Sequence, residues 1–218
     1  MLVFFTAVDW HIYTIIGIHT KPLCLSRTLN ILLFTGHLID QADRHEIRFP
    51  NSLIDKARAL LRTEIESVLH THTPQMAISS LAAGGDLLFA GEALGLKIPL
   101  IVFLPFEVDK FLDVSVAYDK STTEPDLQLW THQFHQIIGQ AQKVVITGSN
   151  DSPLETALTF CNDSMLAYAL AHAGNDPQKV LALALVKSTG EIKKGGSSEF
   201  MRSIRSHGVF VKQIWPRK

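Results

Sequence analysis

Residues Ile78–Asp109 read ISSLAAGGDLLFAGEALGLKIPLIVFLPFEVD and contain a strand, a turn, a helix and a second strand. The first strand is expected at 76–81, where apolar residues lead into a Gly-Gly-Asp turn, and the helix is expected at 87–96. A continuous apolar run at 99–104 predicts the second strand. Apolar runs without alternation are typical of strands that are buried on both faces of a parallel sheet.

The same succession of elements extends in both directions from this unit. Further strands are expected at 29–35, 143–147, 180–186 and 209–214, and further helices at 52–70, 127–141, 154–173 and 198–206. Strands and helices in regular rotation indicate an α/β, Rossmann-like fold, in which helices cover both faces of a mainly parallel sheet. Two polar segments, 40–51 and 107–124 (with a short helix at 110–116), leave the edge of the sheet at which such folds bind ligands. We expect both segments to act as lids.

The chain of 218 residues is long enough for one substantial core, and we expect residues 29–218 to form a single domain. Residues 1–28 begin with the apolar run MLVFFTAVDWHIYTIIGIHT, whose β-branched and aromatic content predicts an arm or extra strands. This run lacks the positive start and the small-residue cleavage site of a signal peptide. Asp9 and His11 interrupt the apolar stretch that a membrane-spanning helix needs. We therefore expect a cytoplasmic protein without a membrane anchor.

The charge of the chain is nearly balanced, with a formal net charge of −1. This balance argues against nucleic-acid binding, which normally requires a basic surface. It hides an asymmetry, because the residues from Lys187 onward include eight Lys and Arg against two Asp and Glu. Either a solvated helix face or a patch that contacts phosphate explains this basic end.

The cysteines and histidines give no sign of a metal site or a disulfide framework. Cys24 and Cys161 are far apart, and the chain has no CxxC motif. The ten histidines include two close pairs, but neither pair has a carboxylate at the spacing of hydrolytic zinc motifs. We therefore expect no metal and no separate cofactor.

Three turns with glycine fall at the expected strand-to-helix junctions. They contain Gly36 and His37, then Gly84, Gly85 and Asp86, and finally Gly195, Gly196, Ser197 and Ser198. Glycine lets a backbone approach a phosphate closely, and a helix start offers N–H groups to an anion, so the three turns together predict a ligand site. The steric needs of a tight connection also explain each turn on its own. The Walker A motif, the GxGxxG fingerprint and the GxSxG elbow are absent, which argues against a conventional ATPase or NAD enzyme.

The strand, Gly-Gly-Asp turn, helix and strand of 78–109, which end in Pro-Phe, resemble the SLOG superfamily of Rossmann-like domains. This group includes the lonely-guy phosphoribohydrolases, DNA-processing protein A and YpsA-like proteins. The segments FTGHLID at 34–40 and GGSSEF at 195–200 are more similar still to the SLOG-like domains of bacterial signalling proteins. The resemblance covers residues 30–216 and implies that 29–218 form a SLOG-like domain.

The resemblance implies a site for a nucleotide or a nucleotide-derived ligand. By position, its residues would be Gly36, His37, Gly84, Gly85, Asp86, Pro105, Phe106, Gly195, Gly196, Ser197 and Ser198. Asp86 would accept hydrogen bonds from ribose hydroxyls, Pro105 and Phe106 would border the base or sugar, and the turn at 195–198 would take phosphate. An ordinary role for Asp86, as a cap of the following helix, is compatible with this one.

These features favour a protein that binds and senses a nucleotide-like small molecule in signalling and passes its occupancy to a protein partner or, in a homo-oligomer, to another copy. The alternative is an enzyme that hydrolyses an N-glycosidic bond, for which Asp86 and Glu92 are the only nearby candidates for an acid or base. The phosphoribohydrolase signature PGGxGTxxE is absent, and Glu92 is also explained as a residue of the helix surface. The sequence leaves open whether the protein is an enzyme.

Overall fold

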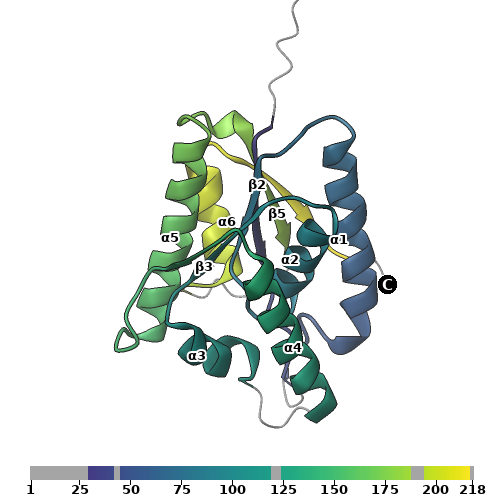
Figure 1. Cartoon of the computed structure of the whole chain (residues 1–218), viewed down its shortest axis with the longest axis vertical. Helices are drawn as coiled ribbons and strands as arrows, with labels where there is room; N and C mark the ends of the chain where they lie inside the picture. The colour runs from purple at the N-terminus through teal and green to yellow at the C-terminus, as the bar shows by residue number, and fades with distance from the viewer. Residues whose placement is uncertain (1–28, 42–44, 119–123, 188–193, 217–218) are drawn as a thin grey trace, which may run out of the picture.

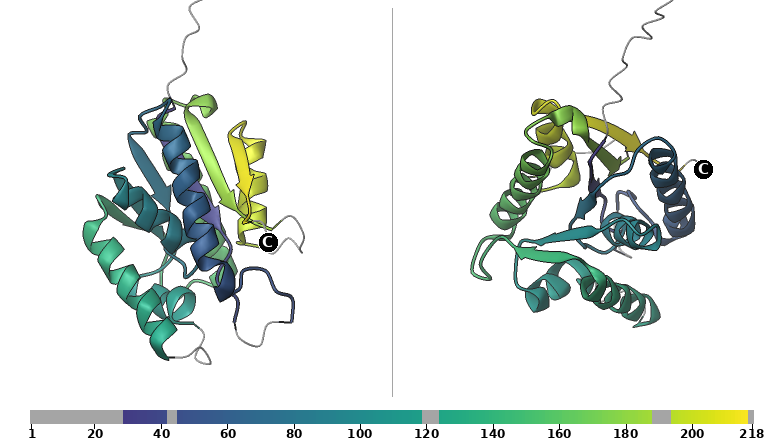
Figure 2. Two further views of the ribbon diagram at one scale, coloured as in Figure 1. Left: turned by 90° about the vertical axis from the view of Figure 1, so that its right-hand side faces the viewer. Right: turned by 45° about the horizontal axis from the view of Figure 1, so that its top comes forward.

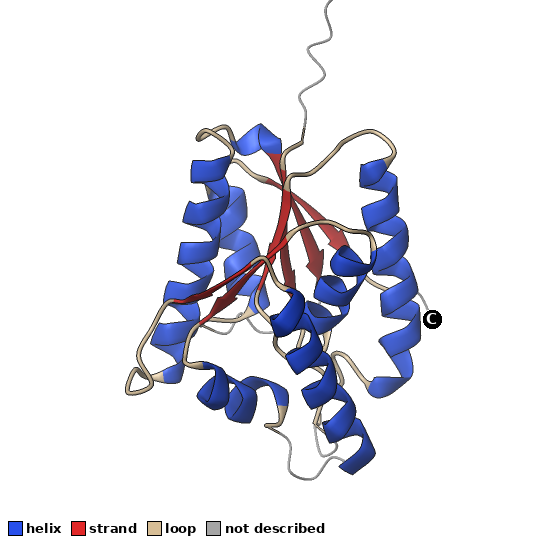
Figure 3. Cartoon of the chain, viewed as in Figure 1, coloured by secondary structure: helices blue, strands red, loops and turns tan. Residues whose placement is uncertain are grey.

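A computed structural model of the chain describes residues 29–41, 45–118, 124–187 and 194–216. The arm or extra strands expected at 1–28 lie outside the described residues. One sheet is formed by six strands: β1 (Ile31–Gly36), β2 (Met76–Ser79), β3 (Leu100–Leu104), β4 (Lys143–Ile146), β5 (Val180–Leu185) and β6 (Phe210–Ile214). All neighbouring strands run parallel, in the order β4-β3-β2-β1-β5-β6 (Figure 3).

Helices cover both faces of the sheet (Figures 1 and 2). One face carries α1 (Ile54–Leu69), α2 (Gly85–Gly95) and α4 (Glu124–Gln140), and the other carries α5 (Leu154–His172) and α6 (Ser197–Ser206). The loops contain α3 (Val108–Phe111), the π-helical turn η2 (Leu112–Val116) and the short 3-10 turns η1 (Asn51–Leu53) and η3 (Pro177–Lys179). This arrangement confirms the α/β, Rossmann-like fold. Within the described part of the chain, no helix is both long enough and apolar enough to cross a membrane.

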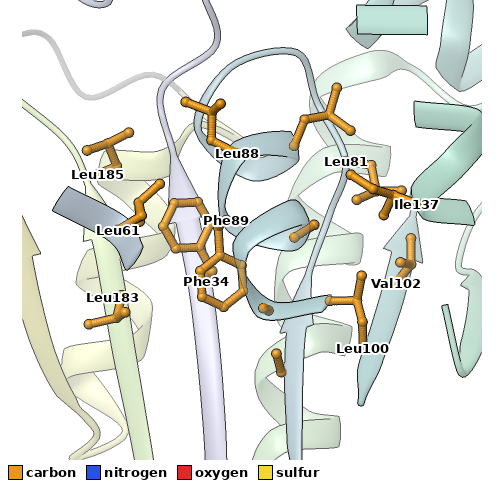
Figure 4. Close-up of a cluster of buried hydrophobic side chains, with 14 of the residues drawn as sticks. Phe34, Leu61, Leu81, Leu88, Phe89, Leu100, Val102, Ile137, Leu183 and Leu185 are labelled. Atoms are coloured by element: carbon orange, nitrogen blue, oxygen red, sulfur yellow. The ribbon is translucent and has the colours of Figure 1, made fainter. Parts of the chain in front are cut away.

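Successive residues of the central strands enter two separate apolar layers. Leu32 and Phe34 of β1 pack with α1, α2 and α4, whereas Ile31 and Leu33 pack with α5 and α6. In the first layer, the ring of Phe34 stacks on that of Phe89 in α2, with centroids 4.4 Å apart (Figure 4). Burial on both faces explains why these strands are continuous apolar runs in the sequence.

The direction in which strands are added to the sheet reverses between β1 and β5. From β1, the next three strands are added on one side, as far as β4. The chain then returns along α5, on the opposite face, to β5 on the other side of β1. Open α/β sheets bind ligands outside the carboxyl ends of the strands that flank such a switch point. A site is therefore expected beyond Gly36 and Leu185, at the end of the sheet toward which the arrows of Figure 3 point.

The observed elements agree with the expected ones to within a few residues, and two of the differences adjoin Gly84. Strand β2 ends at Ser79 and helix α2 already begins at Gly85. The residues between them leave the sheet to bond to neighbouring loops, because Ala83 N–H donates to Ser115 and Ala83 C=O accepts from Ile39. Gly84 then turns the chain into the helix with φ of 112°.

Candidate functional site

A cavity of about 330 Å³ lies at the switch point. Its walls include the turn after β1, the start of α2, the first half of α5 and the turn before α6. The sequence-predicted residues that line it are Gly36, His37, Asp86, Pro105, Gly195, Gly196, Ser197 and Ser198. The three glycine turns therefore meet at one edge of the sheet, as expected for turns that follow parallel strands.

Three of the sequence-predicted residues, Gly84, Gly85 and Phe106, do not line the cavity. Each of them packs against neighbouring parts of the fold instead. Gly85 packs against Gly36 so closely that a Cβ on either residue would lie 2.9 Å from the Cα of the other. A Cβ on Gly84 would lie 2.6 Å from the backbone nitrogen of Ile39. Phe106 is completely buried in the core formed with α2 and α4. The two glycines therefore support the wall residues Gly36 and His37 without lining the cavity themselves.

Glu92, the second candidate acid or base, lies away from the cavity. It is six residues after Asp86 on α2, which corresponds to about 9 Å along the helix axis and about 120° around it. Its carboxylate instead pairs with the guanidinium of Arg62 in α1, at 3.1 Å. Glu92 therefore does not share the cavity with Asp86, the other candidate acid or base.

His37 connects the turn after β1 to the segments that follow β5 and β6. Its imidazole is buried, accepts a hydrogen bond at Nε2 from Lys187 N–H at 3.1 Å, and contacts the ring of Trp215 edge-on. Its backbone N–H donates to Leu185, and its carbonyl accepts from Gly85, both at 3.0 Å. These bonds hold the turn between β5 and α2, so His37 positions the cavity wall in addition to lining it.

Asp86 is the buried carboxyl of the cavity. It lies in the first turn of α2 and is 9% exposed. Burial raises the pKa of this carboxyl to about 7, although hydrogen bonds to backbone groups of Ala82 and Gly36 act in the opposite direction. A carboxyl whose pKa lies near neutral and which faces a cavity can either accept or donate a proton, which is a common property of functional sites.

Cys161 of α5 lines the same cavity. Burial raises the pKa of its thiol to about 12, a hydrogen bond with Thr147 lowers it, and the charge of Asp86 raises it further. The thiol is therefore protonated at neutral pH and is not an activated nucleophile. Among the residues that the structure describes, no group of three His, Cys, Asp or Glu side chains is arranged to hold a metal ion.

The turn before α6 is held in place by hydrogen bonds from three directions. The Glu199 carboxylate accepts from Gly195 N–H, and Asn162 Nδ2 donates to the Gly195 carbonyl at 3.2 Å. Ser197 Oγ donates to the carbonyl of Gly36, which connects α6 to β1. The first N–H groups of a helix have no partner inside it, so this turn offers anchored donors to an anion in the cavity.

Several residues of the wall were not found by sequence reasoning. Glu46 and Arg48 come from the first polar loop, and Phe111 and Ser115 come from the second, so both expected lid segments contribute to the cavity. Lys194 adds a cationic side chain directly before the glycines at 195 and 196. Its position beside a glycine pair at a helix start was a usable signal. The four loop residues carry no comparable signal, because only the three-dimensional course of the loops brings them to the cavity.

Comparisons with known proteins assign no family to the chain. No family model and no curated protein matches the chain. Among solved structures, the X-ray structure of DNA processing protein A (DprA) from Streptococcus pneumoniae is similar, with 15% sequence identity and a TM-score of 0.36. The match covers 86% of this chain and 59% of that one, so the chain spans less than two thirds of the length of DprA. The SLOG assignment thus stays a prediction, and the Rossmann-like fold rests on the strand topology itself.

Proposed function

We propose that the cavity binds a nucleotide or a nucleotide-derived ligand that carries phosphate, and that the protein senses this ligand in signalling. One observation carries the proposal: the anchored turn before α6 and the buried carboxyl of Asp86 face a single cavity at the switch point of the sheet. This pairing combines an anion site with an acceptor for hydroxyl groups. The cavity volume lies at the lower end of the range for small-molecule sites, about 300–1,000 Å³.

The phosphate would bind at the α6 end of the cavity. The N–H groups of Gly196, Ser197 and Ser198 start a helix of ten residues, whose dipole favours negative charge at this end. The side chains of Lys194 and Arg48 line the same cavity and add positive charge. This is the chemistry that recognises a phosphate group or a pyrophosphate.

The sugar and base would occupy the remainder of the cavity. Asp86 offers oxygen acceptors to ribose hydroxyls, and Pro105, Phe111 and Met165 supply apolar surface. The alternative function, hydrolysis of an N-glycosidic bond, is favoured by the near-neutral pKa of Asp86, which suits a general acid or base. The displacement of Glu92 from the cavity and the protonated thiol of Cys161 leave that chemistry with less support than ligand sensing.

Replacement of Lys194 by methionine should weaken binding of phosphate-bearing ligands about tenfold. A charged hydrogen-bond donor contributes roughly 1.5–3 kcal/mol, and the exposure of Lys194 places the loss at the lower end. Thermal shift and calorimetric titrations with AMP, cyclic AMP, ADP-ribose and NAD measure this effect. Lys143→Met on β4, which does not line the cavity, is the matched control and should bind like wild type. If none of these ligands shifts the wild-type melting temperature, the proposed function is wrong.

We expect the wild-type protein to return its ligand intact after prolonged incubation. A sensor needs differential affinity but no positioned proton transfer, whereas a hydrolase releases free base. Chromatography of ligand and products distinguishes the two. Release of base that Asp86→Asn abolishes and Glu92→Gln leaves unchanged would replace the sensor with the hydrolase, because general acid–base groups contribute about 10²–10⁴-fold.

A further inference from the structure

A buried carboxyl lines the same cavity as the turn that is proposed to bind phosphate. Asp86 is 9% exposed, and the hydrogen bonds that lower its pKa come from backbone groups of Ala82 and Gly36. The turn before α6, with Gly196 and Ser198, lines the same cavity. A bound anion and an ionised Asp86 would therefore lie in one cavity, where the burial of the carboxyl leaves little water to screen their repulsion.

We propose that ligand binding in this cavity is coupled to the uptake of one proton by Asp86, so that the protein binds its anionic ligand more tightly as the pH falls through neutrality. The inference rests on the proposed function, because it concerns the same ligand in the same cavity. The coupling would make the affinity for the ligand depend on pH. Because coupling is reciprocal, the anion must favour the proton by the same factor by which the proton favours the anion.

The other charged or titratable groups around Asp86 come from every wall of the cavity. They are His37 after β1, Glu46 and Arg48 in the loop that follows, Cys161 on α5, and Lys194 before α6. Arg48 and Lys194 are cations that an anion stabilises in their charged form, so neither gains a proton on binding.

Asp86 is the best placed of the remaining groups to take up the proton. Cys161 is already protonated, since its pKa is raised to about 12. A proton on Nε2 of His37 would break the hydrogen bond that this atom accepts from Lys187 N–H. Glu46 belongs to an exposed part of its loop, where water screens its charge. Asp86 alone combines burial, an ionised fraction near pH 7 and a place in the cavity.

The expected size of the coupling follows from the titration of Asp86. Its pKa without ligand is about 7, so the carboxyl is mostly ionised at pH 8 and mostly protonated at pH 6. If the bound anion keeps it protonated over this range, the dissociation constant decreases by at most about tenfold from pH 8 to pH 6. The tenfold change requires that the bound anion lie close to the Asp86 carboxylate. A larger distance between these two charges gives a smaller change in the dissociation constant.

Sulfate is a suitable probe, because its charge does not change between pH 6 and pH 8. Titration of the ¹⁵N-labelled full chain with sulfate, followed by NMR through the amides of Gly196 and Ser198, gives a site-specific Kd at each pH. We expect the wild-type Kd to be about three- to tenfold lower at pH 6, and the Kd of Asp86→Asn to be the same at both values. Lys194→Met should bind sulfate more weakly at both pH values and keep the wild-type ratio.

The outcomes separate this inference from the proposed function. If sulfate causes no saturable shift at these amides, the anion site itself is wrong, and the proposed function fails with it. If sulfate binds but its Kd does not depend on pH, or if Asp86→Asn keeps the wild-type ratio, only the coupling is wrong. The amide spectrum of Asp86→Asn shows in the same experiment that the variant is folded.

Discussion

Asp86→Asn should stabilise the protein by about 3 kcal/mol at pH 8 and leave its stability nearly unchanged at pH 4.5. Folding raises the pKa of Asp86 from 3.8 to about 7, so the folded state binds this proton more tightly than the unfolded state does. The contribution of this carboxyl to stability is therefore fully present below about pH 4, is lost as the pH rises toward 7, and does not change further above that.

The size of the gain combines two opposing effects. A pKa difference of about three units corresponds to about 4 kcal/mol of destabilisation by the ionised carboxylate, at 1.36 kcal/mol per unit. Asparagine removes the charge but offers one acceptor oxygen where the carboxylate offers two, and the loss of one hydrogen bond to the backbone costs about 1 kcal/mol. Urea denaturation at pH 4.5 and pH 8 measures the difference between the two proteins.

The exposed Asp163 on α5 gives the control for this experiment. Asp163→Asn also removes one negative charge, but from the surface, so its effect should stay within about 0.5 kcal/mol at both pH values. Destabilisation of Asp86→Asn at pH 8 would mean that the folded state favours the carboxylate, which contradicts a raised pKa of Asp86. A stabilised variant that no longer binds ligand would show that the cavity keeps its charge for function at the expense of stability.

The fold was accessible from the sequence because each of its signals is local. The strands are continuous apolar runs because both faces of the sheet are covered. In β1, for example, all six residues are buried. The position of the cavity followed from topology, because turns after parallel strands emerge at one edge. Neither inference requires knowledge of which side chains touch.

The composition of the wall was less accessible because it depends on contacts between distant segments. Arg48 reaches the cavity because the Asp40 carboxylate accepts hydrogen bonds from the N–H groups of Arg48 and Phe49, at 2.7 and 2.6 Å, and so closes the loop. Tyr118, in the second expected lid segment, donates to the carbonyl of Ile39, which lies directly before the first segment. These contacts join residues that no periodic pattern relates.

Gly84→Ala should destabilise the protein by about 2–6 kcal/mol, although it adds a single methyl group. Gly84 has φ of 112°, a conformation that residues with a Cβ rarely adopt and that costs about 1–3 kcal/mol. The new Cβ would lie 2.6 Å from the nitrogen of Ile39 and 2.8 Å from the carbonyl oxygen of His37. Both contacts are with backbone atoms that cannot rotate away, and overpacking of this kind costs about another 1–3 kcal/mol.

Gly91→Ala, in the helix that follows Gly84, is the matched control for this prediction. Gly91 lies inside α2, and nothing lies within 4 Å of the position that its Cβ would take. Alanine there should stabilise the protein by about 0.5–1 kcal/mol, because it restricts the unfolded chain without a clash. Urea denaturation at pH 7 compares the two variants with wild type. The same small methyl group is thus expected to act in opposite directions at positions seven residues apart, and similar stabilities would show that the turn at Gly84 is free to rearrange and does not fix the shape of the cavity.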